Sequence, residues 1–352
     1  MNKLMYSAPL YFVAFLPMII MLYQLCPQKF RKFVLLLANY AFFFIWSKFF
    51  LVYQVITMLI TYVSAKVIDH TANKKTKKIS LFIAIVINLG VLVVLKYTNF
   101  FGKNIFAIFH QPFTPVRLIA PIGISYYTLQ MISYLMDTSS GKIHSDHSIV
   151  DFAVYANFFP TLIQGPITRF NEIKDSIHAG NPITYQNLKF GSQRILFGLM
   201  KKMIIADRLD PAVSKIFTSY TQDGLFSLIG AVLCTIQLYM DFSGIVDICL
   251  GSAEIFGIKL PENFRQPFFA ENASDFWRRW HITLGTFLRD YVFYPISLAK
   301  PIRRLSKFFT KHFGKAAGKF IGPFIALFAV WFLNGLWHGP YWSYIFYGLY
   351  YF

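Results

Sequence analysis

Charged side chains are scarce in this chain of 352 residues: they make up 14%, whereas soluble domains carry about 25%. Hydrophobic residues reach 56%, above the roughly 45–50% that is usual for globular proteins. Such a chain lacks the polar side chains needed to cover a water-facing surface, so much of its surface must face lipid. The composition and its long apolar segments predict an all-α, polytopic integral membrane protein.

Cysteine is equally sparse, which excludes a disulfide framework. The three cysteines, Cys26, Cys234 and Cys249, lie within or beside apolar stretches and lack the spacing of metal ligands. The tract 144–147 (HSDH) lies in a polar loop, and we interpret it as solvated rather than metal-binding. The chain has no G-x-S-x-G elbow, P-loop or dinucleotide fingerprint, which argues against a serine hydrolase or an ATP-driven pump.

Acidic residues number only 16 against 34 Lys and Arg, for a net charge of +18. The basic residues lie mostly between apolar segments and no groove-reading motif accompanies them, so we expect no nucleic-acid partner. The positive-inside rule explains them better, because Lys and Arg stay near anionic cytoplasmic headgroups. Basic clusters follow the first and third apolar segments: Lys29, Arg31 and Lys32, then Lys74, Lys75, Lys77 and Lys78. Placing both in the cytoplasm makes 33–68 an out-and-back hairpin that turns near 46–48, with the N-terminus outside.

Apolar segments recur along the whole chain. A helix needs about 20 apolar residues to cross a bilayer, and several segments are shorter, so we expect about nine to eleven membrane helices with re-entrant pieces. The first segment is interpreted as a retained span, and the chain as a single domain over 1–352 that is truncated at its C-terminus, inside an apolar stretch. The clearest segments are 7–25, 33–46, 49–68, 80–97, 118–136, 150–165, 190–206, 226–256 and 320–352.

Segment 300–319 (KPIRRLSKFFTKHFGKAAGK) holds seven Lys or Arg and no acid. Phe308, Phe309 and Phe313 interleave with these charges. The pattern predicts a helix on the cytoplasmic membrane face, with its aromatic rings in the interface. A solvated basic loop and a docking site for an acidic partner are the alternatives.

Residues 261–298 mix aromatic with charged side chains, so they form neither a lipid-facing helix nor an ordinary solvated loop. Irregular backbone at membrane depth is tolerated where it lines a cavity, and we expect a buried or re-entrant segment of that kind. Asp241 and Asp247, in the preceding segment, are the expected counter-charges of Arg278 and Arg279. The default interpretation of such pairs is structural.

The last apolar segment contains one ionisable residue, His338. An intramembrane ionisable side chain is a candidate for a functional site, although a lone histidine can instead be a satisfied core donor. Gly335, Gly339 and Pro340 surround it and permit a close approach of a ligand or helix, which favours a site. His281 lies far earlier in the chain, so the two histidines can meet only through the tertiary fold.

Short motifs run in order along nearly the whole chain, and together they resemble the membrane-bound O-acyltransferase family. Within that family they are most similar to a bacterial branch that includes the alginate O-acetyltransferases and the D-alanyl transfer protein of teichoic acids. The motifs are PIGISYYTLQ at 121–130, SYLMD at 133–137, FFP at 158–160, GPI at 165–167 with Arg169, DFSG at 241–244, PENF at 261–264, FWRRWH at 276–281, RDY at 289–291 and GLWHG at 335–339.

The resemblance implies a single domain of membrane helices and re-entrant segments around a central funnel or tunnel. It implies that His338 is the catalytic histidine and His281 a second functional histidine. Tyr351 stands where the family often carries a further histidine. The residues expected to line the tunnel or bind substrate are Trp337, Trp280, Arg278, Arg279, Asn263, Asp241 and Gln130.

The implied reaction needs an acceptor hydroxyl made nucleophilic. A histidine with an ordinary pKa of about 6.5 can act as general base, and we expect His338 to take the hydroxyl proton as the oxygen attacks a thioester carbonyl. We expect His281 to position the acyl group or polarise its carbonyl, and the nearby arginines to hold an anionic donor. An acyl-histidine intermediate is the alternative route.

The resemblance also implies the partners and the location. The donor is acetyl-CoA or another acyl thioester, on CoA or on an acyl carrier protein, with no bound cofactor and no metal. The acceptor is an extracytoplasmic polysaccharide, or a secreted SGNH-type transferase that passes the group onward, and the protein is a multi-pass protein of the bacterial plasma membrane. D-Alanyl transfer to teichoic acid, a transporter or flippase for a glycan precursor, and a scaffold for polymer secretion remain alternatives.

Overall fold

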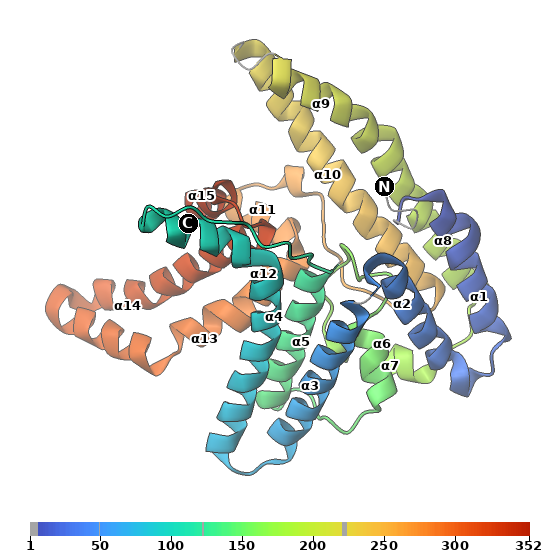
Figure 1. Cartoon of the computed structure of the whole chain (residues 1–352), viewed down its shortest axis with the longest axis horizontal. Helices are drawn as coiled ribbons and strands as arrows, with labels where there is room; N and C mark the ends of the chain where they lie inside the picture. Colours follow the sequence, from blue (N-terminus) through green and yellow to red (C-terminus); the bar gives the residue numbers. More distant parts are fainter. Residues whose placement is uncertain (1–5, 49, 122, 220–223) are drawn as a thin grey trace.

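The computed structural model of the chain describes residues 6–48, 50–121, 123–219 and 224–352, so Ile122 of the 121–130 motif lies outside the described residues. Within these ranges every regular element is helical, as the composition predicted (Figure 1). The α-helices are α1 (Leu16–Leu25), α2 (Arg31–Ser47), α3 (Phe50–His70), α4 (Lys74–Ile108), α5 (Ile124–Ser139), α6 (Ile149–Ala156), α7 (Phe170–Ala179), α8 (Tyr185–Leu199), α9 (Asp207–Ser219), α10 (Gly224–Ile255), α11 (Ala273–Arg279), α12 (Ile282–Leu288), α13 (Tyr294–Ser297), α14 (Lys300–His338) and α15 (Trp342–Tyr351).

Shorter helical turns join several of these elements. The π-helical turns are η1 (Tyr11–Phe15), η3 (Met200–Ala206) and η5 (Arg289–Phe293), and the 3₁₀ turns are η2 (Gln28–Phe30) and η4 (Pro267–Phe269). By length and composition, four helices of the described residues can cross a membrane: α3, α4, α10 and α14. Apolar side chains such as Val63, Phe82 and Leu228 are exposed on three of these helices, as lipid contact requires.

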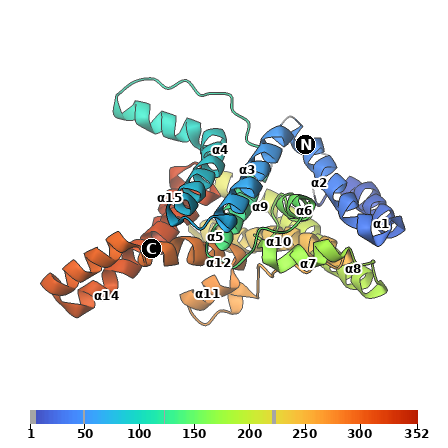
Figure 2. The same ribbon diagram turned by 90° about the horizontal axis from the view of Figure 1, so that it is seen from below.

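Helices α2 and α3 form the hairpin predicted for 33–68, and its turn lies at the expected place. Helix α4 then packs against α3, so its lysine-rich start lies at the same end of the hairpin as the start of α2 (Figure 2). Asn73 caps α4, because its Oδ1 accepts hydrogen bonds from the backbone N–H groups of Lys75 and Thr76. The two basic clusters therefore share one side of the structure, as the positive-inside interpretation requires.

The buried core lies where the N-terminal helices meet residues 149–170. Asn39 fixes this contact, because its Nδ2 donates to the Val154 carbonyl at 3.1 Å and its Oδ1 accepts from the Phe159 N–H at 2.9 Å. The apolar segment 150–165 is helical only as far as Ala156: α6 ends there and turns follow. Pro160 and Pro166 lack the N–H that a helix interior needs, and this explains the irregular chain.

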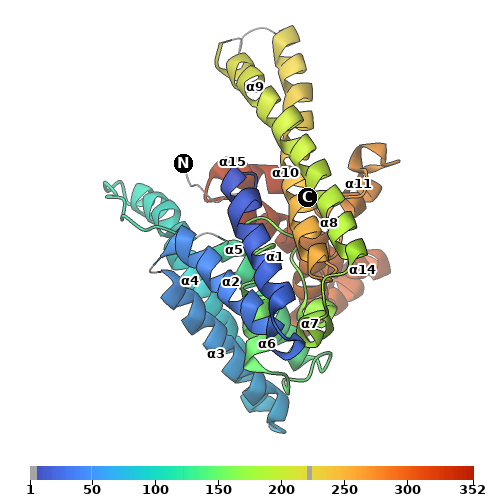
Figure 3. The same cartoon turned by 90° about the vertical axis from the view of Figure 1, so that its right-hand side faces the viewer.

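Helix α10 packs closely against α8 and η3 (Figure 3). Two glycine pairs permit the approach, since a Cβ at Gly198 would lie 2.5 Å from the Gly244 carbonyl oxygen and one at Gly191 would lie 2.6 Å from that of Gly251. Small residues at such crossings are how membrane helices gain packing contacts.

Helix α14 is a bent hairpin rather than one straight span. Gly314 has φ 89° and ψ 168°, and this break separates two helical arms, 300–313 and 315–338. The arms pack against each other, because a Cβ at Gly318 would collide with the Thr310 side chain. The helix predicted for 300–319 is thus present as the first arm, the bend and the start of the second arm (Figure 1). Phe308 and Phe313 are exposed.

We expect Gly198→Ala to lower the melting temperature of the purified protein, because the added methyl group forces α8 and α10 apart. Overpacking of this kind costs about 1–3 kcal/mol. Gly90→Ala in α4 is the matched control, since nothing lies within 4 Å of its added Cβ. An unchanged melting temperature for Gly198→Ala, or an equal loss in both variants, would contradict this account of the packing.

Candidate functional site

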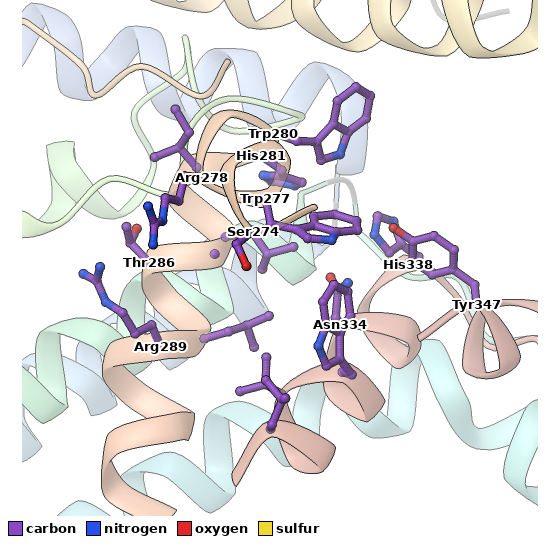
Figure 4. A pocket seen from close by; sticks show the side chains of 17 residues that line it. Ser274, Trp277, Arg278, Trp280, His281, Thr286, Arg289, Asn334, His338 and Tyr347 are labelled. Atoms are coloured by element: carbon purple, nitrogen blue, oxygen red, sulfur yellow. The ribbon is translucent and has the colours of Figure 1, made fainter. Parts of the chain in front are cut away.

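Two cavities meet at His281 and His338. The first has a volume of about 590 Å³ and the second about 690 Å³, and both are lined by the two histidines together with Trp280 and Tyr347. Figure 4 shows the first cavity, with Arg278, Thr286 and Arg289 grouped away from His338 and Tyr347. The tertiary fold therefore brings together the two histidines that the sequence singled out.

His281 occupies an unusual backbone position between α11 and α12. Its φ of 46° and ψ of 50° are left-handed, which is uncommon for a residue other than glycine. Its ring is buried and packs edge-to-face on Phe242 at 4.9 Å, and its Nδ1 lies 3.2 Å from Asn263 Oδ1. Burial, with the nearby His338 as a second cause, lowers the pKa of His281 to about 3, so the ring is neutral at physiological pH.

Asn263 determines which ring nitrogen of His281 carries the proton. Its Oδ1 also accepts hydrogen bonds from the N–H of Thr283 at 3.1 Å and from Thr283 Oγ1 at 2.9 Å, so this atom is the amide oxygen. An amide oxygen only accepts, hence Nδ1 of the neutral ring donates and Nε2 is left with a free lone pair. His281 therefore offers an acceptor to a ligand, whereas polarising a carbonyl, one of its two expected roles, needs a donor.

His338 is the last residue of α14, where the chain leaves the helix at Gly339. Helix α15 returns against this end so closely that a Cβ at Gly335 would lie 2.3 Å from the Tyr344 carbonyl oxygen. The ring of His338 lies between two tyrosines of α15, stacked on Tyr344 at 6.0 Å and edge-on to Tyr347 at 5.6 Å. The glycines that the sequence flagged around His338 thus permit contact between two helices.

The first cavity carries basic and hydroxyl side chains. Arg278, Arg289, Ser274 and Thr286 line it, and Asn334 lines it near His338 (Figure 4). Asn334 is four residues before His338 on α14, so both side chains lie on one helix face. Positive charge with a carboxamide beside a histidine fits an anionic ligand whose reacting group reaches the histidines.

The second cavity lies on the other side of the histidines. Lys96 of α4 and Asp241 of α10 line it, together with Trp337 and with residues 120–121 and 123–126 before and at the start of α5. Of the seven residues expected to line a tunnel or bind substrate, Trp280, Trp337, Arg278 and Asp241 lie on one or both cavities.

The other three expected residues, Arg279, Asn263 and Gln130, do not line these two cavities. Asn263 instead holds His281, and Arg279 Nε donates to Asp275 Oδ2 at 2.8 Å within α11. Gln130 is buried in α5, where its carbonyl oxygen accepts from the hydroxyl of Tyr155. All three residues thus contribute packing or hydrogen bonds within the protein.

The two aspartates of α10 pair with basic side chains of α8 and η3. Asp247 accepts from Arg194 Nε and Lys201 Nζ, each at 2.6 Å, and Asp241 accepts from Lys202 Nζ. The expectation that they neutralise the two arginines of α11 is therefore wrong. The glycine crossings between α8, η3 and α10 are the reason, because they put three basic side chains beside the acids. Among the described ion pairs, none involves Arg278, which leaves its charge for the first cavity.

A second polar network holds the cavity segment against α5. The guanidinium of Arg169 pairs with Asp290, which also accepts from Arg289 Nε at 2.9 Å, and the hydroxyl of Tyr291 donates to Asp137 Oδ2 at 2.7 Å. Burial acts to raise the pKa of Asp290, but the hydrogen bonds from Arg289 and Arg169 lower it overall. The network fixes η5 to the end of α5 and so orients Arg289 at the first cavity.

The lining residues that sequence reasoning missed include Lys96, Asn334 and Tyr347. The spacing of Asn334 and His338 on one helix was a usable signal. A lysine within an apolar segment was another, because buried cations at membrane depth are rare. Nothing in the local sequence distinguished Tyr347 from its many aromatic neighbours.

Among the described residues no cluster of three metal-ligating side chains occurs, and the 144–147 tract forms a loop.

Comparison with known proteins identifies the relatives of the chain. Residues 124–352 match the model of the membrane-bound O-acyltransferase family. The chain is 33% identical over 352 residues to a probable alginate O-acetylase of Pseudomonas aeruginosa, covering 98% of this chain and 64% of that protein. It is 32% identical to a peptidoglycan O-acetyltransferase of Helicobacter pylori, with 98% of this chain and 68% of the relative covered.

A teichoic acid D-alanyltransferase of Bacillus subtilis is 31% identical over 244 residues, which cover 68% of this chain and 59% of the relative. The chain thus spans about two thirds of the length of the relatives that match it from end to end. The family model covers more than half of the chain and includes both histidines, Arg278 and Asn334. On this similarity, the chain belongs to the membrane-bound O-acyltransferase family.

Proposed function

We propose that the protein is an O-acyltransferase of the bacterial plasma membrane that moves an acetyl group from a cytoplasmic thioester to a hydroxyl outside the cell. The observation that carries this proposal is the meeting of two cavities at His281 and His338. A transporter needs a path for its whole substrate, whereas group transfer needs two binding sites that share one reactive centre. The acceptor is a polysaccharide or an SGNH-type transferase that passes the acetyl group onward.

The topology of α4 and α5 supports an assignment of each cavity to one side of the membrane. Helix α4 starts at the basic cluster 74–78, so its other end and the loop after it lie outside under the positive-inside rule. Ala120 and Pro121 of that loop line the second cavity, which makes it the acceptor side. Helix α5 runs back inward, and Asp137 near its end holds Tyr291 of η5, so Arg289 and the first cavity face the cytoplasm.

The proposed reaction uses His338 as general base. The hydroxyl oxygen of the acceptor attacks the thioester carbonyl carbon while the imidazole takes its proton. The carbon–sulfur bond then breaks, and the imidazolium returns the proton to the leaving thiolate. The Asn334 carboxamide lies one turn away and donates a hydrogen bond to the carbonyl oxygen as it gains negative charge.

His281 would act on the donor by accepting a hydrogen bond. CoA and carrier-protein thioesters share a pantetheine arm, whose amide N–H groups suit the free Nε2 lone pair. Such a contact positions the acyl group without a charge change on the buried ring. Arg278, which lacks a described carboxylate partner, supplies positive charge for donor phosphates.

Acetyl is preferred over D-alanyl as the group that moves. The Pseudomonas aeruginosa and Helicobacter pylori relatives, whose names specify acetyl transfer, match 98% of the chain, whereas the Bacillus subtilis D-alanyltransferase matches 68%. D-Alanyl transfer to teichoic acid is the second candidate, and the same cavities serve it.

Replacing His338 tests the function. We expect His338→Ala to lower acetyl transfer from labelled acetyl-CoA by about 10²–10⁴-fold in proteoliposomes, because the general base is lost. His312→Ala is the control, since this histidine lies exposed on the first arm of α14. Transfer at the wild-type rate by His338→Ala would overturn the mechanism, and histidine-independent translocation of a glycan precursor would favour a flippase.

Replacing Arg278 tests the donor side. We expect Arg278→Ala to raise KM for acetyl-CoA by about 10-fold or more with little change in kcat, because hydrogen bonds to charged groups contribute about 1.5–3 kcal/mol. Arg279→Ala is the matched control, because the neighbouring guanidinium pairs with Asp275 and does not line the cavity. Equal KM values for both variants would contradict a role of Arg278 in donor binding.

A further inference from the structure

Lys96 is a partly buried cation well inside α4, a helix apolar enough to cross the membrane. Its Nζ donates to the Trp337 carbonyl oxygen and to Ser125 Oγ, each at 3.0 Å. The same ammonium lies 5.6 Å from the centre of the Trp337 ring. A cation at this depth is costly unless it is paired, and here its partners are a helix end and a hydroxyl.

The end of α14 explains why a cation belongs there. The last four carbonyl groups of a helix lack partners within it and carry partial negative charge. The Lys96 ammonium donates a hydrogen bond to the Trp337 carbonyl oxygen. The hydroxyl of its neighbour Tyr97 donates to the Leu336 carbonyl oxygen at 2.7 Å. Two consecutive residues of α4 thus cap the two carbonyl groups immediately before His338.

We propose that Lys96 is a positioning residue for the acyl transfer: it caps the end of α14, and so fixes the ring of His338 between the two cavities. This inference rests on the proposed function. Lys96 lines the second cavity together with His338, so its cation and the imidazole face the same space. Groups that face this region from the packed elements are Asp241 of α10, Tyr126 of α5, His281 before α12 and Tyr344 and Tyr347 of α15.

Kinetics of Lys96 variants test the proposal. We expect Lys96→Met to lower kcat for acetyl transfer by about 10²-fold, the effect of misplacing a catalytic group by about an ångström, with an unchanged KM for acetyl-CoA. Lys96→Arg keeps a cation and donors, and should recover much of this loss. Lys103→Met is the matched control, because it removes an exposed lysine from the same helix. The proposal is overturned if Lys96→Met keeps kcat within a few-fold of wild type, if it changes only KM, or if Lys96→Arg is no better than Lys96→Met.

A milder variant serves if Lys96→Met does not fold. Ser125→Ala removes one of the two hydrogen bonds that hold the ammonium and leaves the cation in place. We expect a loss of kcat of about 3–10-fold, the usual contribution of one hydrogen bond, with an unchanged melting temperature. Wild-type kcat in Ser125→Ala would then count against the proposal.

Chemical labelling separates this inference from the proposed function. At pH 8, where ordinary imidazoles are neutral, diethylpyrocarbonate should modify His338 about threefold faster or more in Lys96→Met, because the last turn of α14 opens more often. His312 is the internal control and should react equally in both proteins. An inactive wild-type protein would overturn the proposed function alone, whereas equal labelling of His338 would overturn the role of Lys96.

Discussion

The last carbonyl groups of a helix lack partners within it, and the end of α14 depends on side chains that supply them. The partners come from α4, through the side chains of Lys96 and Tyr97. Helix α15 then packs against the same turn, where Gly335 leaves no room for a side chain. The distant helix α4 and the next helix along the chain, α15, thereby fix one residue, His338. The same arrangement shapes the wall of each cavity, because His338 and neighbouring residues of α14 line both cavities.

The second histidine is held by backbone that is not helical. Residues 256–266 run without a regular element, and this segment brings Asn263 under the ring of His281. One amide oxygen accepts from His281 and from both donors of Thr283, while the Asn263 carbonyl accepts from the Ile282 N–H at 3.0 Å. Irregular backbone of this kind survives at membrane depth only when it is buried in protein or lines a cavity. Its polar groups are used here to fix the orientation and the tautomer of one ring.

Composition and charge patterning were sufficient to predict the helical class, the hairpin of α2 and α3, and a cavity-lining segment at 261–298. Those features follow from local apolar content and from the cost of charge in lipid, both readable along the chain. The pairing of Asp241 and Asp247 was not readable, because it depends on how closely α8 approaches α10 at Gly198 and Gly244. The bend of α14 at Gly314 was missed for a similar reason, since a glycine in a basic segment marks no particular backbone angle. His281 and His338 were linked by resemblance to a family, not by spacing, because only tertiary structure brings them together.

The boundary between the cavities also has an electrical consequence. The two volumes share four lining side chains, Trp280, His281, His338 and Tyr347. Ions that crossed there would lose hydration among aromatic rings, a cost that a covalently held acyl group would not meet. Under the proposed function an acetyl group carries no charge, and its passage does no work against the membrane potential. A D-alanyl group carries an ammonium, and moving that charge outward against an inside-negative potential costs about 2.3 kcal/mol per 100 mV. Acyl groups of similar size would therefore differ in how strongly their transfer responds to the energised state of the cell.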